Sequence, residues 1–118
     1  MKEGCIGKYS FPENERIKKS DEISWLKGNG KVIYGKYYLV IYKRNDKPFN
    51  RLGIIVSKKN RTSIIRNYEK RIIREIYRTN KEILERKIDL LVIKKKDNET
   101  SFQKKLNDLK KLFKHTQY

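Results

Sequence analysis

The segment from Thr62 to Asn80 constrains the fold most, because helical spacing separates its apolar residues from its basic ones. At about 100° per residue, one side of such a helix carries mostly apolar side chains: Ile65, Tyr68, Ile72 and Ile76. The opposite arc, roughly 140° wide, is basic or amide-bearing: Arg66, Asn67, Lys70, Arg71, Arg74 and Arg78. The segment is therefore predicted to be an amphipathic helix with one side in the core.

The basic arc of this helix predicts contact with phosphates. Like charges one turn apart destabilise a helix, so their clustering is tolerable where anions lie among them. A guanidinium grips phosphate with two donors and also stacks on bases. Lys58, Lys59 and Arg61 extend the same basic surface upstream. A solvated helix face is the alternative, but it would mix acids into the arc, whereas Glu69 and Glu75 lie at the borders of the apolar side.

The charge of the whole chain points the same way. Its 118 residues suffice for one domain and include 31 Lys and Arg against 14 Asp and Glu, a net charge of +17. This charge makes the compact state repel itself unless a polyanion offsets it, so a nucleic acid is the expected partner. An anionic membrane surface is the rival partner.

Other classes of protein find little support. The lone Cys5 rules out an internal disulfide, and with the lone His115 it matches no familiar zinc spacing. No apolar run is long enough to span a bilayer, and residues 1–10 lack a secretory signal, so we expect a cytoplasmic protein. No catalytic constellation is visible, and Asp89, within an apolar strand, is interpreted as the anchor of a turn or a salt bridge.

The remaining elements predict a single small α+β domain. Residues 1–15 are interpreted as a flexible basic arm, and residues 16–118 as an RNA-binding domain. A first helix, capped by Ser20, ends at residues 28–30. A long strand over 31–43, bent near Gly35, is expected to form an antiparallel hairpin with a strand over 52–57. A buried strand over 88–93 and a last helix over 102–113, with a capping box at Thr100 and Gln103, complete the order α-β-β-α-β-α.

The aromatic residues of the first strand leave two possibilities open. Alternation puts Tyr38, Val40 and Tyr42 on one face of the strand and Tyr37 on the other. One face must pack on the helices, and the other is free to stack unpaired bases. The alternative is that all these rings belong to the core.

A set of short motifs around the long helix resembles a known family. The stretches are Val56-Ser57-Lys58-Lys59, Arg66-Asn67, Lys70-Arg71 and Arg74-Glu75. In this order and spacing they resemble the signature of the bacterial ribonuclease P protein. Residues 16–30, 89–93 and 102–113 are compatible with the flanking elements of that family. The order of elements matches none of the common modules that read DNA grooves.

The resemblance implies a fold and a function. The fold would be an α/β sandwich with a left-handed β-α-β crossover, similar to one domain of a ribosomal protein. The chain would be the non-catalytic subunit of a ribonucleoprotein endoribonuclease, whose catalytic RNA uses magnesium to remove the 5′ leader from precursor tRNA. It would bind that RNA and the precursor tRNA, need no obligate protein partner, and hold no metal in a site of its own. A structural ribosomal or other RNA-binding protein is the alternative.

The resemblance also assigns residues, with some departures from the family pattern. The basic helix would contact the catalytic RNA, and a cleft between the first helix and the sheet would hold the single-stranded leader. The cleft residues would be Ile23, Leu26, Tyr34, Tyr38 and Tyr42. The usual Arg-Asn-Arg motif has Tyr68 at its third position here, followed by Glu69, and Arg61 replaces a common glycine. Cleft positions often held by phenylalanine correspond here to Ile23 and to either Leu26 or Lys27.

Overall fold

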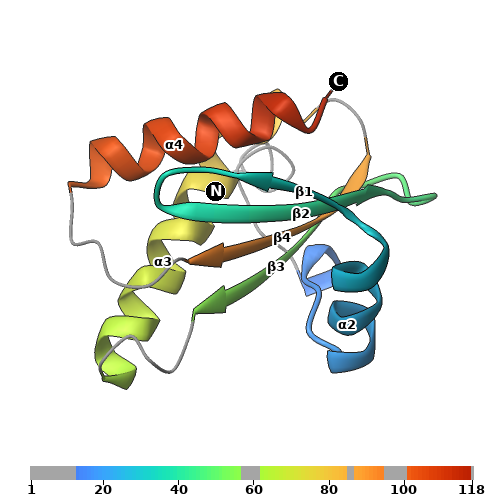
Figure 1. Ribbon diagram of the computed structural model, residues 1–118, viewed down its shortest axis with the longest axis horizontal. Coiled ribbons are helices and arrows are strands. Elements are labelled where there is room, and N and C mark those ends of the chain that lie inside the picture. Colours follow the sequence, from blue (N-terminus) through green and yellow to red (C-terminus); the bar gives the residue numbers. More distant parts are fainter. Residues whose placement is uncertain (1–12, 57–61, 85–86, 95–100, 118) are drawn as a thin grey trace, which may run out of the picture.

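A four-stranded mixed sheet separates two unequal helical layers in the computed structural model, which describes residues 13–56, 62–84, 87–94 and 101–117 (Figure 1). The elements in chain order are η1 (Glu13–Glu15), α2 (Ser20–Asn29), β1 (Lys31–Tyr34), β2 (Tyr38–Arg44), β3 (Arg51–Val56), α3 (Ser63–Thr79), η2 (Lys81–Ile83), β4 (Ile88–Lys94) and α4 (Phe102–His115). Helices α3 and α4 pack on one face of the sheet, over the larger core. Helix α2 packs on the other face, over a smaller cluster.

The long strand expected over residues 31–43 is in fact a hairpin of β1 and β2, so the prediction of one bent strand is wrong. The Gly35 N–H donates to the Tyr38 carbonyl at 2.8 Å, which closes the turn. Asp108 of α4 accepts hydrogen bonds from the backbone N–H groups of Lys36 and Tyr37, at 3.0 and 2.9 Å. A Cβ at position 35 would lie 2.8 Å from the Asp108 carboxylate, so a larger residue would displace Asp108 from these hydrogen bonds.

The predicted antiparallel pairing of β2 with β3 is also wrong, because β4 lies between them in the order β1-β2-β4-β3. Strand β4 is antiparallel to β2 and parallel to β3. Its side chains Leu90, Leu91 and Val92 are fully buried, as expected of a central strand covered on both faces. The connection from β3 through α3 to β4 is thus a β-α-β crossover. Its left-handed sense remains an implication of the family resemblance.

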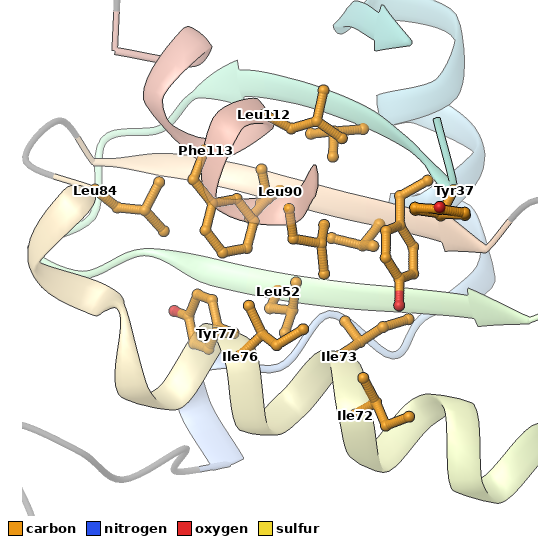
Figure 2. Packing of buried hydrophobic residues seen from close by; sticks show 14 of the residues in the cluster. Tyr37, Leu52, Ile72, Ile73, Ile76, Tyr77, Leu84, Leu90, Leu112 and Phe113 are labelled. Carbon is orange, nitrogen blue, oxygen red and sulfur yellow. The ribbon is translucent and has the colours of Figure 1, made fainter. Parts of the chain in front are cut away.

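Helix α3 forms where its periodicity predicts. Thr62 caps its start by accepting a hydrogen bond from the Ile65 N–H at 3.3 Å. In Figure 2, Ile73 and Ile76 of α3 point into the core, and Phe113 of α4 points into the same core from across it. All three side chains are fully buried, so the apolar side of α3 is fixed against the sheet and α4.

The borders of that apolar side differ from the prediction. Ile65 is only half-buried, and Tyr68 is 57% exposed. Glu69 is instead buried, because the Nζ of Lys105 on α4 lies 3.0 Å from its carboxylate. A helical wheel does not include a partner on another helix, so it could not place this acid in the interior.

The termini of the other helices also differ in detail. Lys19 occupies the N-cap position of α2, without a side-chain hydrogen bond, where Ser20 was expected. Ser101 caps α4 by accepting from the Lys104 N–H at 3.3 Å, while the expected Thr100 lies outside the described residues.

Part of the predicted flexible arm belongs to the folded domain. Residues 13–15 form a short 3-10 turn, and Glu15 lies 2.8 Å from the Nζ of Lys81. The Tyr77 hydroxyl also hydrogen-bonds to Glu15, at 3.3 Å. Residues 1–12 of the arm lie outside the described residues.

Candidate nucleic-acid interface

The basic face of α3 is the first candidate surface, and its members are Arg66, Asn67, Lys70, Arg71, Arg74 and Arg78. Asn67 and Arg71 are exposed, and the other four are half-buried. Burial of Ile72, Ile73 and Ile76 on the opposite side fixes the rotation of the helix and turns these side chains outward. Lys58, Lys59 and Arg61, predicted to extend this surface, lie outside the described residues.

One arginine of the basic face forms an ion pair with a neighbouring acid. The Arg78 guanidinium donates to both carboxylate oxygens of Glu75, at 2.7 and 2.9 Å, across one turn of α3. Glu75 is itself exposed beside the basic face. The pair lowers the net positive charge near the C-terminal end of the basic face. Arg71 and Arg74 lie nearer the middle of this face.

A shallow groove of about 540 Å³ follows the outer side of α3 and extends to the start of α4. It is lined by Arg16, Tyr68, Arg71, Ile72, Arg74, Glu75, Arg78 and Phe102. The two aromatic rings are both accessible, with Tyr68 57% exposed and Phe102 44% exposed. The groove thus combines guanidinium groups with exposed rings, which are the two kinds of group that hold single-stranded nucleic acid.

The second candidate surface is the sheet face that α2 covers only in part. Ile41 and Leu91 of the sheet are buried there against Leu26 and the half-buried Ile23 of α2. Val32 and Tyr34 of β1 share this face, because they pair with Ile41 and Leu39 of β2. Val32 is 41% exposed and Tyr34 is 74% exposed, so the face stays open away from α2.

Trp25 adds an aromatic ring to this surface that the sequence interpretation missed. It is 54% exposed on α2, and the Nζ of Lys43 lies 5.9 Å from its ring centroid. A hollow of about 460 Å³ beside it is lined by Ile17, Asp21, Glu22, Trp25, Leu26, Arg51 and Asp89. Trp25 directly precedes a buried leucine and is the chain's only tryptophan, which was the available signal.

The predicted cleft residues therefore divide between the two faces of the sheet. Ile23, Leu26 and Tyr34 lie on the α2 face, although Leu26 is buried. Tyr38 is fully buried on the opposite face, so its assignment to an open cleft is wrong. Burial raises the pKa of its phenol well above the usual value, with the charges of nearby carboxylates adding to the shift. Tyr42 is half-buried against the same core and is also wrongly assigned.

An ion cluster holds α2 to the sheet at the end of this surface. The Arg51 guanidinium donates to both oxygens of Asp89, at 2.9 and 2.7 Å, and to Glu22 of α2 at 3.3 Å. Asn45, in the turn after β2, also donates to Asp89 at 2.8 Å. Burial by itself would raise the pKa of Asp89, but these hydrogen bonds and positive charges outweigh it and lower the pKa below its usual value. The prediction that Asp89 anchors a turn or a salt bridge is confirmed on both counts.

Within the described ranges, no group of three or more His, Cys, Asp or Glu side chains is arranged to hold a metal ion. Nor does any helix in the described part of the chain have the length and apolar character to cross a membrane.

Comparison with known proteins decides the family. The family model described as Ribonuclease P matches residues 11–117. The chain belongs to the ribonuclease P protein family. The ribonuclease P protein component of Dictyoglomus turgidum is 38% identical over 90 residues, which cover 76% of each chain.

Solved structures of ribonuclease P proteins share the fold. The protein from Thermotoga maritima superposes with a TM-score of 0.79 at 29% identity, covering 86% of this chain and 96% of that one. A Staphylococcus aureus RNase P protein mutant superposes with a TM-score of 0.82 at 27% identity, covering 89% and 90%. The resemblance inferred from the motifs around α3 is thus confirmed, as is the α+β fold, with the order corrected to α-β-β-β-α-β-α. A ribonuclease P protein component is an RNA-binding part of a tRNA-processing ribonucleoprotein, so a structural ribosomal role is not supported.

Proposed function

We propose that this chain is the non-catalytic protein subunit of ribonuclease P and binds two RNAs through two surfaces. The basic face of α3 binds the catalytic RNA. The open sheet face beside α2 binds the single-stranded 5′ leader of precursor tRNA and so assists removal of the leader. Membership of the ribonuclease P protein family supports the partnership with the RNA.

The arrangement of α3 carries the first half of the proposal. Its buried isoleucines leave an outer surface on which five cations, from Arg66 to Arg78, follow each other within four turns. Phosphates that bind there release counterions and relieve the repulsion among the cations. The two guanidinium groups of Arg71 and Arg74, which have no acid between them in sequence, are the best placed to grip the phosphate backbone.

Exposed rings on the α2 face support the second half. Trp25, Val32 and Tyr34 present aromatic and apolar surface outside both cores. Unpaired bases stack on such rings for roughly 1–3 kcal/mol each, whereas paired bases in a duplex cannot reach them. A leader is single-stranded, so this surface would favour precursor over mature tRNA. Lys43 beside Trp25 would attract the leader phosphates.

The chemistry is assigned to the RNA in this proposal. Magnesium would be held by the catalytic RNA and its substrate, and two of the three carboxylates that line the hollow beside Trp25 are engaged in structure. Asp89 and Glu22 both bind Arg51, which leaves them poorly suited to hold magnesium. The protein would contribute positive charge and base stacking, in the cytoplasm, without an obligate protein partner.

Recovery of the bound RNA from cells tests the proposal. The full chain, tagged at one end, is isolated from its source cells and the associated RNA is sequenced. One abundant non-ribosomal RNA together with tRNA precursors is the expected result. Recovery dominated by ribosomal RNA, undiminished by the double substitution of Arg71 and Arg74 by glutamate, would overturn the proposal.

A further inference from the structure

We propose that the Tyr68 ring is a stacking platform for an unpaired base of the RNA that α3 binds. This inference rests on the proposed function, because it requires that the RNA lie along the outer side of α3. It assigns a base contact to a groove otherwise lined mainly by arginines.

The ring is accessible where a packed residue would not be. Tyr68 lies in the first half of α3 and is 57% exposed, while Ile72, one turn further, is buried. The lining of the groove also includes Phe102, at the first position of α4, which is 44% exposed. Two accessible rings in one groove form apolar surface that the protein core does not use.

A buried cation occupies one side of the Tyr68 ring. The Nζ of Lys105 lies 5.8 Å from the ring centroid, within the range of a cation–π contact. The same ammonium is held by both carboxylate oxygens of Glu69, at 3.0 and 3.2 Å, and is itself buried. Lys105 is therefore fixed, and its contact with the ring orients Tyr68. A base can approach the side of the ring that Lys105 does not occupy.

The charges around the ring favour a nucleotide over an apolar peptide. Arg71 and Arg74 follow Tyr68 by one and nearly two turns and line the same groove. The residues that line the groove include one acid, Glu75, and four arginines: Arg16, Arg71, Arg74 and Arg78. A base on Tyr68 would place its own phosphate, or the next one along the strand, within reach of Arg71. The ligand class is thus a single-stranded segment of RNA, held by stacking and by guanidinium–phosphate contacts.

Equilibrium binding of the ribonuclease P RNA to the full-length protein tests this inference. The variants are Tyr68→Ala, Tyr68→Leu and Tyr68→Phe, each measured over a range of salt concentrations. We expect Tyr68→Phe to bind as the wild type does, since it keeps the ring. Tyr68→Ala and Tyr68→Leu should bind about 5- to 150-fold more weakly, which corresponds to loss of one stacked base. The salt dependence should not change, because stacking releases no counterion.

Other outcomes would overturn the inference. Unchanged affinity of Tyr68→Ala would show that no base stacks there, and equal binding by Tyr68→Leu and Tyr68→Phe would show that any apolar side chain suffices. A shallower salt dependence of Tyr68→Ala would indicate a phosphate contact instead. Thermal unfolding of each variant is the control that checks whether the fold is retained. Arg71→Glu separates the two proposals: if it weakens binding and Tyr68→Ala does not, only the stacking site is wrong, and if neither does, both are wrong.

Discussion

The ammonium of Lys105 on α4 lies 3.0 and 3.2 Å from the two carboxylate oxygens of Glu69 on α3, and both side chains are buried. This ion pair joins two helices through residues that lie 36 positions apart in the chain. The same ammonium lies 5.8 Å from the centroid of the Tyr68 ring. The pair therefore links the packing of α4 to the surface that we assign to RNA.

Removing one partner of this pair should destabilise the domain strongly. Glu69→Ala leaves the Lys105 ammonium buried without a counter-ion, which costs about 3–5 kcal/mol. Replacing both residues, as in Glu69→Leu with Lys105→Met, should recover most of that loss because no charge remains buried. Urea unfolding of the two variants and the wild type measures the difference. A single variant as stable as the wild type would mean that the pair is not buried in solution.

The cluster around Asp89 should make stability depend on pH in the acid range. The folded-state pKa of Asp89 lies below its usual value, so the ionised form stabilises the fold. This contribution is fully present above about pH 4, the unfolded pKa, and is lost as the pH falls through the folded pKa. Asp89→Asn should cost about 1–3 kcal/mol at pH 7, and the difference from the wild type should shrink near pH 3. Urea unfolding at both pH values tests this, and a gap that stays constant would contradict it.

Glu75 should weaken RNA binding in the native protein. Glu75→Gln removes a negative charge from the border of the basic face, and with it the carboxylate that binds the Arg78 guanidinium. We expect tighter binding to the ribonuclease P RNA and a salt dependence steeper by up to about one unit. Glu82→Gln, the same change of charge on η2, is the matched control and should have a smaller effect. Equal effects of the two substitutions would mean that net charge alone matters.

Tyr34 should contribute to discrimination between precursor and mature tRNA. Tyr34→Ala removes the most exposed ring of the α2 face and should weaken binding of precursor tRNA to the holoenzyme by roughly 1–3 kcal/mol, with little effect on mature tRNA. Tyr34→Phe keeps the ring and serves as the control. Equal weakening of both tRNAs by Tyr34→Ala would remove this ring from the leader-binding surface.

Local pattern was enough to predict α3, its basic face and the central strand β4. The helix carries its signal within one segment, in the separation of Ile72 and Ile76 from Arg71 and Arg74. The apolar run in β4 likewise indicates a strand buried on both faces. The family motifs lie around the same helix, which is why the family and the partner class could be predicted without a structure.

Contacts distant in sequence explain what the sequence did not predict. The turn at Gly35 depends on Asp108, and the burial of Glu69 depends on Lys105, both on α4. Both faces of β2 are largely apolar, so alternation could not decide which face is open and Tyr38 was assigned to the wrong one. The pairing of β3 with β4 rather than with β2 likewise depends on tertiary packing, because β4 is buried in the middle of the sheet.

The affinity of the ribonuclease P RNA for two variants of equal charge tests the central claim most directly. One variant carries Arg71→Glu and Arg74→Glu on the basic face of α3, and the other carries Lys111→Glu and Lys114→Glu on α4. All but the half-buried Arg74 are exposed, and the two variants lose the same net charge. The α3 variant should bind at least about tenfold more weakly, with a salt dependence shallower by about two units, while the α4 variant stays near the wild type. Equal weakening of both variants, or stronger weakening of the α4 variant, would contradict the assignment of α3 as the RNA interface.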